Sequence, residues 1–118
     1  MTRITQCALI ENEQQLETTL KTHDTLMIMF YASWCPFCQY FLPIFGHCLQ
    51  EASVGCYRMT IDRYPALCEK YTIEIYPTVL FFQQGKISKR LDGIQGRGIT
   101  EEQLHDFLKD CDVKKVRK

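Results

Sequence analysis

The sequence predicts an α/β fold in which helices flank a central mixed β-sheet, in the order βαβαβαββα. Apolar runs of strand length alternate with segments whose apolar residues recur every four positions, as α/β folds require. Two runs near the C-terminal end are separated by Gln84-Gly85, a turn that predicts an antiparallel hairpin. The last amphipathic segment opens with Thr100 and Gln103, the spacing of a helix capping box.

The first elements follow from local patterns. Residues 3–10 predict a strand, and Asn12 predicts the start of a helix whose Leu16 and Leu20 lie on one face. This helix is expected to end near residues 23–24. Residues 26–32 are apolar almost throughout, which is typical of a central strand covered on both faces.

A second helix is expected to begin at Pro36, because a proline in the first turn loses no hydrogen bond. It should run to about residue 51, with a kink at Pro43. The later elements are a strand over 55–61, a short helix over 65–71, paired strands over 78–83 and 86–91, and a last helix that turns Leu104, Phe107, Leu108 and Cys111 inward.

Composition indicates one domain over residues 1–118, because 118 residues of which 46% are hydrophobic suffice for a single core. Lys and Arg total 14, as do Asp and Glu, so no charge excess points to nucleic acid or an acidic membrane as a partner. The basic segment 112–118 is expected to be a frayed tail. A monomer is expected.

No stretch is long and apolar enough for a secretory signal or a membrane span, which favours a cytoplasmic location. The seven cysteines are odd in number and irregularly spaced. That usage is typical of free thiols in a reducing compartment. The sequence of an exported protein that has lost its leader would show the same features.

Cys35 and Cys38 stand two residues apart at the predicted helix start. The thiolate is the reactive form of cysteine, and unpaired N–H groups at a helix start stabilise it on Cys35. Cys38 lies one turn further on, where it can attack a mixed disulfide on Cys35. The spacing predicts a working dithiol.

A structural pair or half of a zinc site is the alternative. A four-ligand zinc site needs a second close pair, and the other cysteines are isolated in the sequence, so no metal and no organic cofactor is expected; an Fe–S cluster bridging two chains stays open. His47-Cys48 is interpreted as packing rather than a ligand pair, and His23 and His105 are assigned no role. Cys68 and Cys111 could be regulatory thiols. These other cysteines are Cys7, Cys48, Cys56, Cys68 and Cys111.

Two blocks resemble the thioredoxin superfamily over nearly the whole chain, from about residue 4 to 111. The run FYASWCPFC, residues 30–38, resembles its active-site strand and helix, with Pro43 following. The run IYPTVLFF, residues 75–82, resembles the segment that holds its cis-proline, and Gly93 falls where the family has a glycine before its last helix.

The resemblance implies a thioredoxin fold and a role for each matching residue. Cys35 is the expected nucleophile and Cys38 the resolving thiol, and Pro77 is an expected cis-proline packed against the sulfurs. Tyr76 would offer its backbone to an extended peptide. Trp34, Pro36 and Phe37 complete the expected substrate surface, with Phe37 either contacting substrate or filling space.

Two departures from the family's pattern bear on mechanism. Met29 occupies the position of a buried carboxylate in thioredoxins and disulfide isomerases, so the deprotonation of Cys38 needs water or another group, and exchange should be slower or differently dependent on pH. Pro36-Phe37 resembles the glutaredoxin dipeptide, which favours a potential more oxidising than the roughly −270 mV of thioredoxin.

The expected function is reduction or exchange of protein disulfides, with electrons from a reductase or from glutathione. Three alternatives stay open. One is a thioredoxin-fold interaction module with little turnover, one is an exported oxidase or isomerase, and one is a glutaredoxin-like enzyme.

Overall fold

The computed structural model describes residues 7–50 and 54–111, and within them five strands form one sheet in the order β1-β3-β2-β4-β5. β1 and β2 both run parallel to β3, β4 runs antiparallel to β2, and β5 returns antiparallel to β4. The strands are β1 (Ala8–Leu9), β2 (Thr25–Tyr31), β3 (Gly55–Thr60), β4 (Thr78–Gln83) and β5 (Lys86–Asp92).

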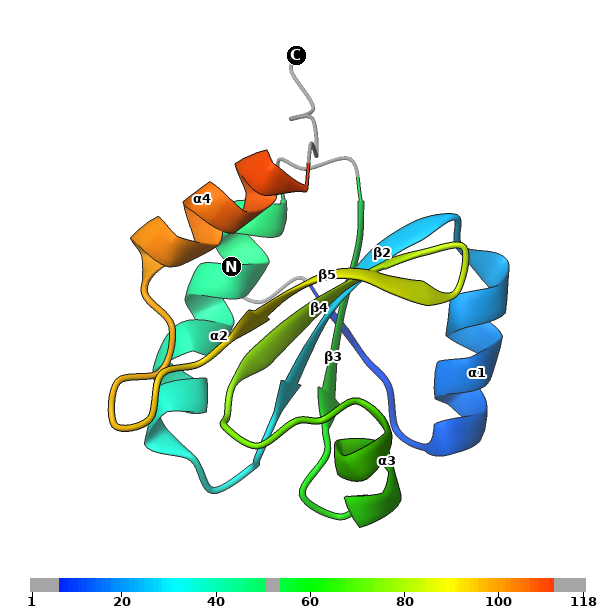
Figure 1. Cartoon of the computed structure of the whole chain (residues 1–118), viewed down its shortest axis with the longest axis horizontal. Helices are drawn as coiled ribbons and strands as arrows, with labels where there is room; N and C mark the ends of the chain where they lie inside the picture. Colours follow the sequence, from blue (N-terminus) through cyan, green and yellow to red (C-terminus); the bar gives the residue numbers. More distant parts are fainter. Residues whose placement is uncertain (1–6, 51–53, 112–118) are drawn as a thin grey trace, which may run out of the picture.

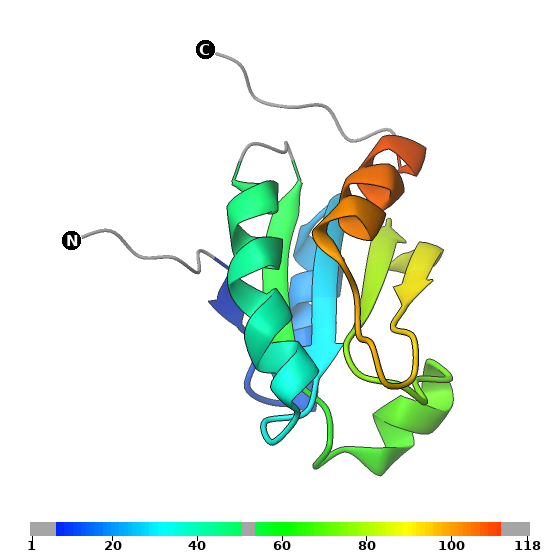
Figure 2. The same ribbon diagram turned by 90° about the vertical axis from the view of Figure 1, so that its left-hand side faces the viewer.

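Helices cover both faces of this sheet (Figure 1). Figure 2 shows two of them side by side on one face, with another behind the sheet. Side chains of α2 and α4 share a buried cluster with one face of the strands, and side chains of α1 and α3 share a second cluster with the other face. The helices are α1 (Glu13–Thr22), α2 (Pro36–Leu49), α3 (Pro65–Lys70) and α4 (Glu101–Asp110).

The central strand β2 is buried on both faces, as its apolar run predicts. Met27 and Met29 point toward α2 and α4, whereas Ile28 and Phe30 point toward α1 and α3. Successive residues of a strand face opposite sides, so a strand between two helical layers must be apolar at every position. β2 leads directly into the loop before α2 and so fixes where that helix begins.

The predicted fold class and element order are confirmed. The first strand is limited to Ala8–Leu9 among the described residues, and residues 3–6, residue 51 and the tail 112–118 lie outside them. The capping box of α4 is present, since Gln103 N donates to Thr100 Oγ1 at 3.1 Å and Thr100 N donates to Gln103 Oε1 at 2.9 Å. Pro43 lies inside a continuous α2.

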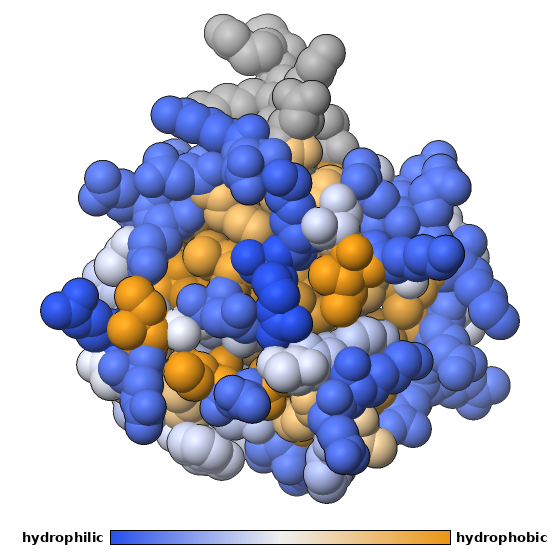
Figure 3. Space-filling model, viewed as in Figure 1, coloured by the Kyte–Doolittle hydropathy of each residue, from blue (hydrophilic) through white to orange (hydrophobic). Residues whose placement is uncertain are grey.

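β5 forms an edge of the sheet and is protected by charge. Lys86, Lys89 and Arg90 lie along it, and hydrophilic side chains run across the middle of the face drawn in Figure 3. Charged residues on an edge strand discourage pairing with a second chain.

No helix among the described residues is long and apolar enough to cross a membrane.

The prediction that all cysteines outside the dithiol are free and isolated is wrong for Cys7 and Cys56. They form a disulfide, with 4.8 Å between their Cα atoms. The pair is 49 residues apart in sequence. Ala8 and Tyr57, the next residue of each strand, are partners in the β1–β3 ladder, so the sheet register brings the two cysteines together. Spacing along the chain cannot show this register.

Candidate active site

Cys35 is the N-cap residue of α2, and Pro36 is the first residue of that helix. Cys35 N donates to Ala32 O at 3.2 Å, so a tight turn carries the chain from β2 into α2. Cys38 N donates to Cys35 O at 3.1 Å, which places the second cysteine one turn into the helix. Cys35 is only 5% exposed, and Cys38 is buried. The structure therefore brings both predicted thiols together at the helix start.

The cis peptide bond predicted at Tyr76-Pro77 is present, and it lies against the dithiol. Cys35 Sγ lies 4.0 Å from Tyr76 O and is placed to donate a weak hydrogen bond to it. Thr78 Oγ1 donates to Ile75 O at 2.7 Å, which ties the two ends of this turn together. The second sequence block thus meets the first, although 41 residues separate Cys35 from Tyr76.

A shallow groove opens beside Cys35. Trp34, 65% exposed, packs edge-on against Tyr76 with 6.0 Å between ring centroids. Tyr76 lines the groove, whereas Pro77 is buried behind it and does not. The other lining residues are Pro36 and Phe37, which were predicted from the sequence, and Glu74, Ile75, Gln95 and Gly96, which were not.

The four residues that sequence reasoning missed belong to two loops. Glu74 and Ile75 come just before the cis-proline, and Gln95 and Gly96 come just after Gly93. The second motif and Gly93 could have indicated these positions. Phe37 is placed to fill space beside Gly98, and its contact with a substrate stays a prediction. It lines the groove, and its side chain lies where a Cβ on Gly98 would stand 2.9 Å away.

Gly93 allows the chain to approach the cis-proline closely. A Cβ at this position would stand 2.6 Å from Pro77 O, a distance that real contacts do not reach. The atom in conflict is backbone, so a larger residue must push the loop and the Pro77 turn apart.

We expect Gly93→Ala to lower the free energy of unfolding by about 1–3 kcal/mol, because an added methyl overpacks the site. Displacing the turn beside Cys35 by about 1 Å should also reduce turnover roughly a hundredfold. Gly85→Ala is the matched control. Gly85 has φ +80° in the β4–β5 turn, so alanine strains the backbone there at the other end of β4. Denaturant melts measure the stability of both variants, and insulin reduction measures their turnover. An equal loss of turnover in Gly93→Ala and Gly85→Ala contradicts this interpretation of Gly93.

The two thiols differ in environment. Burial raises the pKa of Cys38 to about 12, and a hydrogen bond with the Cys35 thiol, the charge of Cys35 and the charge of Asp62 push in the same direction. A backbone hydrogen bond involving Ala32 opposes them. Asp62 also accepts a hydrogen bond from Ser33 N at 3.4 Å, so this carboxylate lies beside the loop that holds the dithiol. Cys38 therefore keeps its proton at neutral pH.

We expect alkylation of Cys38 to stay slow from pH 7 to pH 10. Moving the pKa from 9.0 to about 12 leaves about a thousandth of the thiolate that an ordinary cysteine has below pH 9. The rate should rise tenfold per pH unit throughout this range. Iodoacetamide labelling followed by peptide mapping measures it, with Cys68 as the internal comparison. A labelling midpoint near pH 9 at Cys38 contradicts the assignment.

Met29 is fully buried in the cluster beneath α2. Its ladder partner on β3 is Arg58, whose guanidinium donates to neutral acceptors among the residues that the structure describes. Arg58 Nη1 donates to Tyr31 Oη at 2.9 Å, and Arg58 Nε donates to Cys7 O at 3.3 Å. The side chain of Met29 itself therefore cannot accept a proton from Cys38.

The remaining cysteines lie outside this groove. Cys68 Sγ donates to Ile61 O at 3.5 Å and lies 3.6 Å from Tyr76 Oη. Burial raises the pKa of Cys111 to about 11, which makes that thiol less reactive than an ordinary one. The expectation that Cys48 is isolated is wrong, because its Sγ lies 3.6 Å from Nε2 of His105 on the neighbouring helix.

Comparison with known proteins agrees with this geometry. The Thioredoxin family model matches residues 7–110. The chain is 31% identical over 101 residues to a thioredoxin of Mycoplasmoides gallisepticum, covering 85% of this chain and 97% of that protein. It is 33% identical over 87 residues to a thioredoxin-like protein of Synechocystis, covering 70% and 81%.

A solved structure shows the same fold. The oxidised thioredoxin of Plasmodium falciparum superimposes with a TM-score of 0.75 at 16% identity, covering 90% of this chain and 98% of that one. Three observations point to the same family. They are the dithiol at a helix start beside a cis-proline, the five-stranded mixed sheet and the match to the family model. This chain belongs to the thioredoxin family, whose members are thiol–disulfide oxidoreductases in kind.

Proposed function

We propose that this chain reduces or exchanges disulfides of other proteins through Cys35 and Cys38. The observation that carries the proposal is the position of Cys35. Its sulfur lies at the start of α2, next to Tyr76 O, at the edge of an open groove. The groove gives a substrate access to this sulfur, and Cys38 lies one turn further along the same helix, where it can attack a mixed disulfide on Cys35.

The exchange takes two steps. The thiolate of Cys35 attacks one sulfur of the substrate disulfide, that bond breaks, and the departing substrate sulfur takes up a proton. Cys38 then loses its proton and attacks Cys35 Sγ, which breaks the mixed disulfide and releases the second substrate thiol. Two electrons and two protons pass to the substrate, and Cys35 and Cys38 are left as a disulfide.

The environment of Cys38 sets the pH dependence of the second step. Formation of the mixed disulfide removes the Cys35 thiol as a hydrogen-bond partner and as a charge, but burial, the largest cause of the raised pKa, remains. With Met29 in place of a carboxylate, proton removal falls to water or another group. We therefore propose that the resolving step accelerates as pH rises from 7 to 9.

The groove supports recognition of extended, loosely specified peptides. Trp34 and Phe37 are exposed apolar side chains that line the groove together with Ile75 and Tyr76. A peptide laid along the cis-proline turn pairs through backbone groups, which read no particular sequence. Flexible or unfolded protein segments are the substrate class that we propose.

Insulin reduction tests the proposal, with dithiothreitol and glutathione as alternative electron sources. Turnover well above the uncatalysed rate is the expected result. Turnover with glutathione alone favours a glutaredoxin-like enzyme, and a potential near −120 mV favours an oxidase over the reductase proposed here. The cytoplasmic location, the monomeric state and the use of a reductase stay predictions, which fractionation, sedimentation and reductase-coupled assays check.

The second candidate is an interaction module that uses the same groove with little turnover. The observation that favours it is Met29, because the missing carboxylate removes the proton acceptor that exchange chemistry uses in relatives of this fold. Absence of insulin reduction with either electron source, in a protein that still melts cooperatively, supports the module and contradicts the enzyme.

A further inference from the structure

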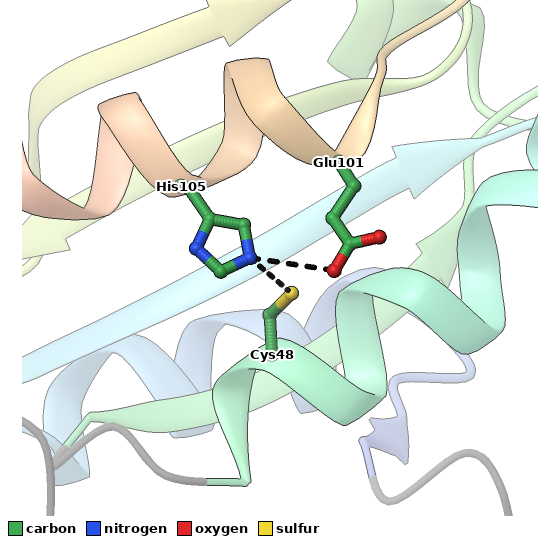
Figure 4. A group of neighbouring side chains, drawn as sticks. All are labelled: Cys48, Glu101 and His105. Atoms are coloured by element: carbon green, nitrogen blue, oxygen red, sulfur yellow. Dashed lines mark hydrogen bonds and ion pairs between the residues drawn. The ribbon is translucent and has the colours of Figure 1, made fainter.

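A second cluster of metal-binding side chains lies on the opposite half of α2 from the dithiol. Cys48 comes from the last turn of α2, and Glu101 and His105 come from the first turns of α4. Figure 4 shows the three side chains pointing toward one another across the gap between the two helices. Cys48 follows Cys35 by 13 residues, so at 1.5 Å per residue the cluster lies about 20 Å from the nucleophile.

The three donor atoms converge on a small volume. His105 Nε2 lies 3.6 Å from Cys48 Sγ and 3.4 Å from Glu101 Oε2, and all three atoms lie within 4.8 Å of one another. In tetrahedral zinc coordination, typical bond lengths give edges of about 3.6 Å between sulfur and nitrogen and about 3.4 Å between nitrogen and oxygen. Both separations match the edges that a shared ion requires.

A hydrogen bond between His105 and Cys48 together with an ion pair between His105 and Glu101 explains the convergence of the three side chains less fully than a shared ion does. Both contacts use Nε2 of His105, which carries at most one proton. With that proton present a single N–H faces two acceptors, and without it Nε2 accepts from the Cys48 thiol while its lone pair also faces the Glu101 carboxylate. With the His105 proton on Nδ1 instead, lone pairs of His105 Nε2, Cys48 Sγ and Glu101 Oε2 point at one place. A cation between them satisfies all three at once.

The donor set and its surroundings favour zinc. Thiolate sulfur, imidazole nitrogen and carboxylate oxygen together form a ligand set that Zn²⁺ accepts, whereas Mg²⁺ and Ca²⁺ prefer oxygen alone. The side chains of His105 and Glu101 are 48% and 59% exposed, so an ion can enter from solvent. Glu101 and His105 are four residues apart on α4 and therefore share one face of that helix.

We propose that Cys48, Glu101 and His105 form a three-ligand Zn²⁺ site that joins α2 to α4. Water or an added ligand takes the fourth position, as in zinc sites with three protein ligands. Binding replaces the proton of the Cys48 thiol with the metal, so it strengthens as pH rises. A bound ion also withdraws Cys48 from thiol exchange and tightens the packing of the helix that begins at Cys35.

Cobalt and zinc titrations test the site, with the active-site thiols removed because they could bind metal themselves. In the Cys35→Ser/Cys38→Ser protein, titrated without reductant so that the Cys7–Cys56 disulfide stays closed, we expect one Co²⁺ per chain, with the sulfur-to-cobalt charge-transfer band and the visible bands of tetrahedral cobalt. Adding Cys48→Ser should abolish the charge-transfer band. Adding His105→Gln, at an exposed position, should weaken Zn²⁺ binding by at least about a hundredfold, since even supporting residues of a zinc site cost 10- to 100-fold.

Cys68→Ser on the same background is the matched control, and it should leave both spectrum and affinity unchanged. A second readout is thermal: Zn²⁺ should raise the melting temperature of the background protein but not that of the His105→Gln variant. Absence of the cobalt spectrum in the background protein, or its survival after Cys48→Ser, overturns the proposal. Because the dithiol is absent throughout, neither result bears on the proposed disulfide exchange.

Discussion

Cys35→Ser should reduce insulin turnover at least about a thousandfold, the largest loss of activity of any single substitution in this chain. Serine keeps the shape of the site, but its hydroxyl does not ionise near neutral pH and does not attack a disulfide. Cys38 cannot replace it, because burial raises the pKa of that thiol to about 12. Single-turnover reduction of a labelled disulfide peptide, followed by rapid quench, measures the loss at the attacking step.

Cys68→Ser is the control for this substitution, since it removes another thiol outside the groove and should retain turnover. The fold of each variant is checked by its denaturant midpoint. Substantial residual turnover in Cys35→Ser means that a different sulfur attacks the substrate, and it contradicts the assignment of Cys35 as nucleophile.

Phe45→Ala should cause the largest loss of stability. Phe45 is fully buried between α2 and the sheet, and its ring lies 6.0 Å from that of Phe41, centroid to centroid. Truncating a buried phenylalanine removes apolar contact and leaves a cavity, at a cost of about 3–5 kcal/mol. Domains of this size have only about 5–15 kcal/mol of stability, so the melting temperature should fall by roughly 15 °C or more.

Tyr40→Ala is the matched control on the same helix. Tyr40 is 72% exposed, so its truncation should change the free energy of unfolding by no more than about 0.5 kcal/mol. Urea melts of the two variants and the wild type give the comparison. A loss below 1 kcal/mol for Phe45→Ala would show that α2 contributes little to the core.

Much of the fold could be predicted because each element carries its own local pattern. The unbroken apolar run of β2 reports burial on two faces, and the Thr100 capping box marks the start of α4 within one residue. The dithiol was equally visible, since Cys35 and Cys38 lie within one helical turn and Pro36 marks where that helix begins. Such signals involve residues that are neighbours in the chain.

The site could be predicted only where a recurring motif carried long-range information. The resemblance linked Tyr76 and Pro77 to the dithiol across some 40 residues, and the structure brings them together. It did not indicate that Pro77 is buried while Glu74, Ile75, Gln95 and Gly96 line the groove. Which side of a turn faces solvent depends on what packs behind it, here Gly93 against Pro77 O.

By itself, the sequence determined the order of strands and helices, the central place of β2 and the pairing of two thiols at a helix start. Only the tertiary structure decided that Cys7 joins Cys56, that Cys48 meets Glu101 and His105, and that Cys38 holds its proton. The physical reason is the range of the interactions. Hydrophobic periodicity records which face of one element is buried, whereas contacts between distant elements depend on sheet register and helix packing, which no single segment encodes.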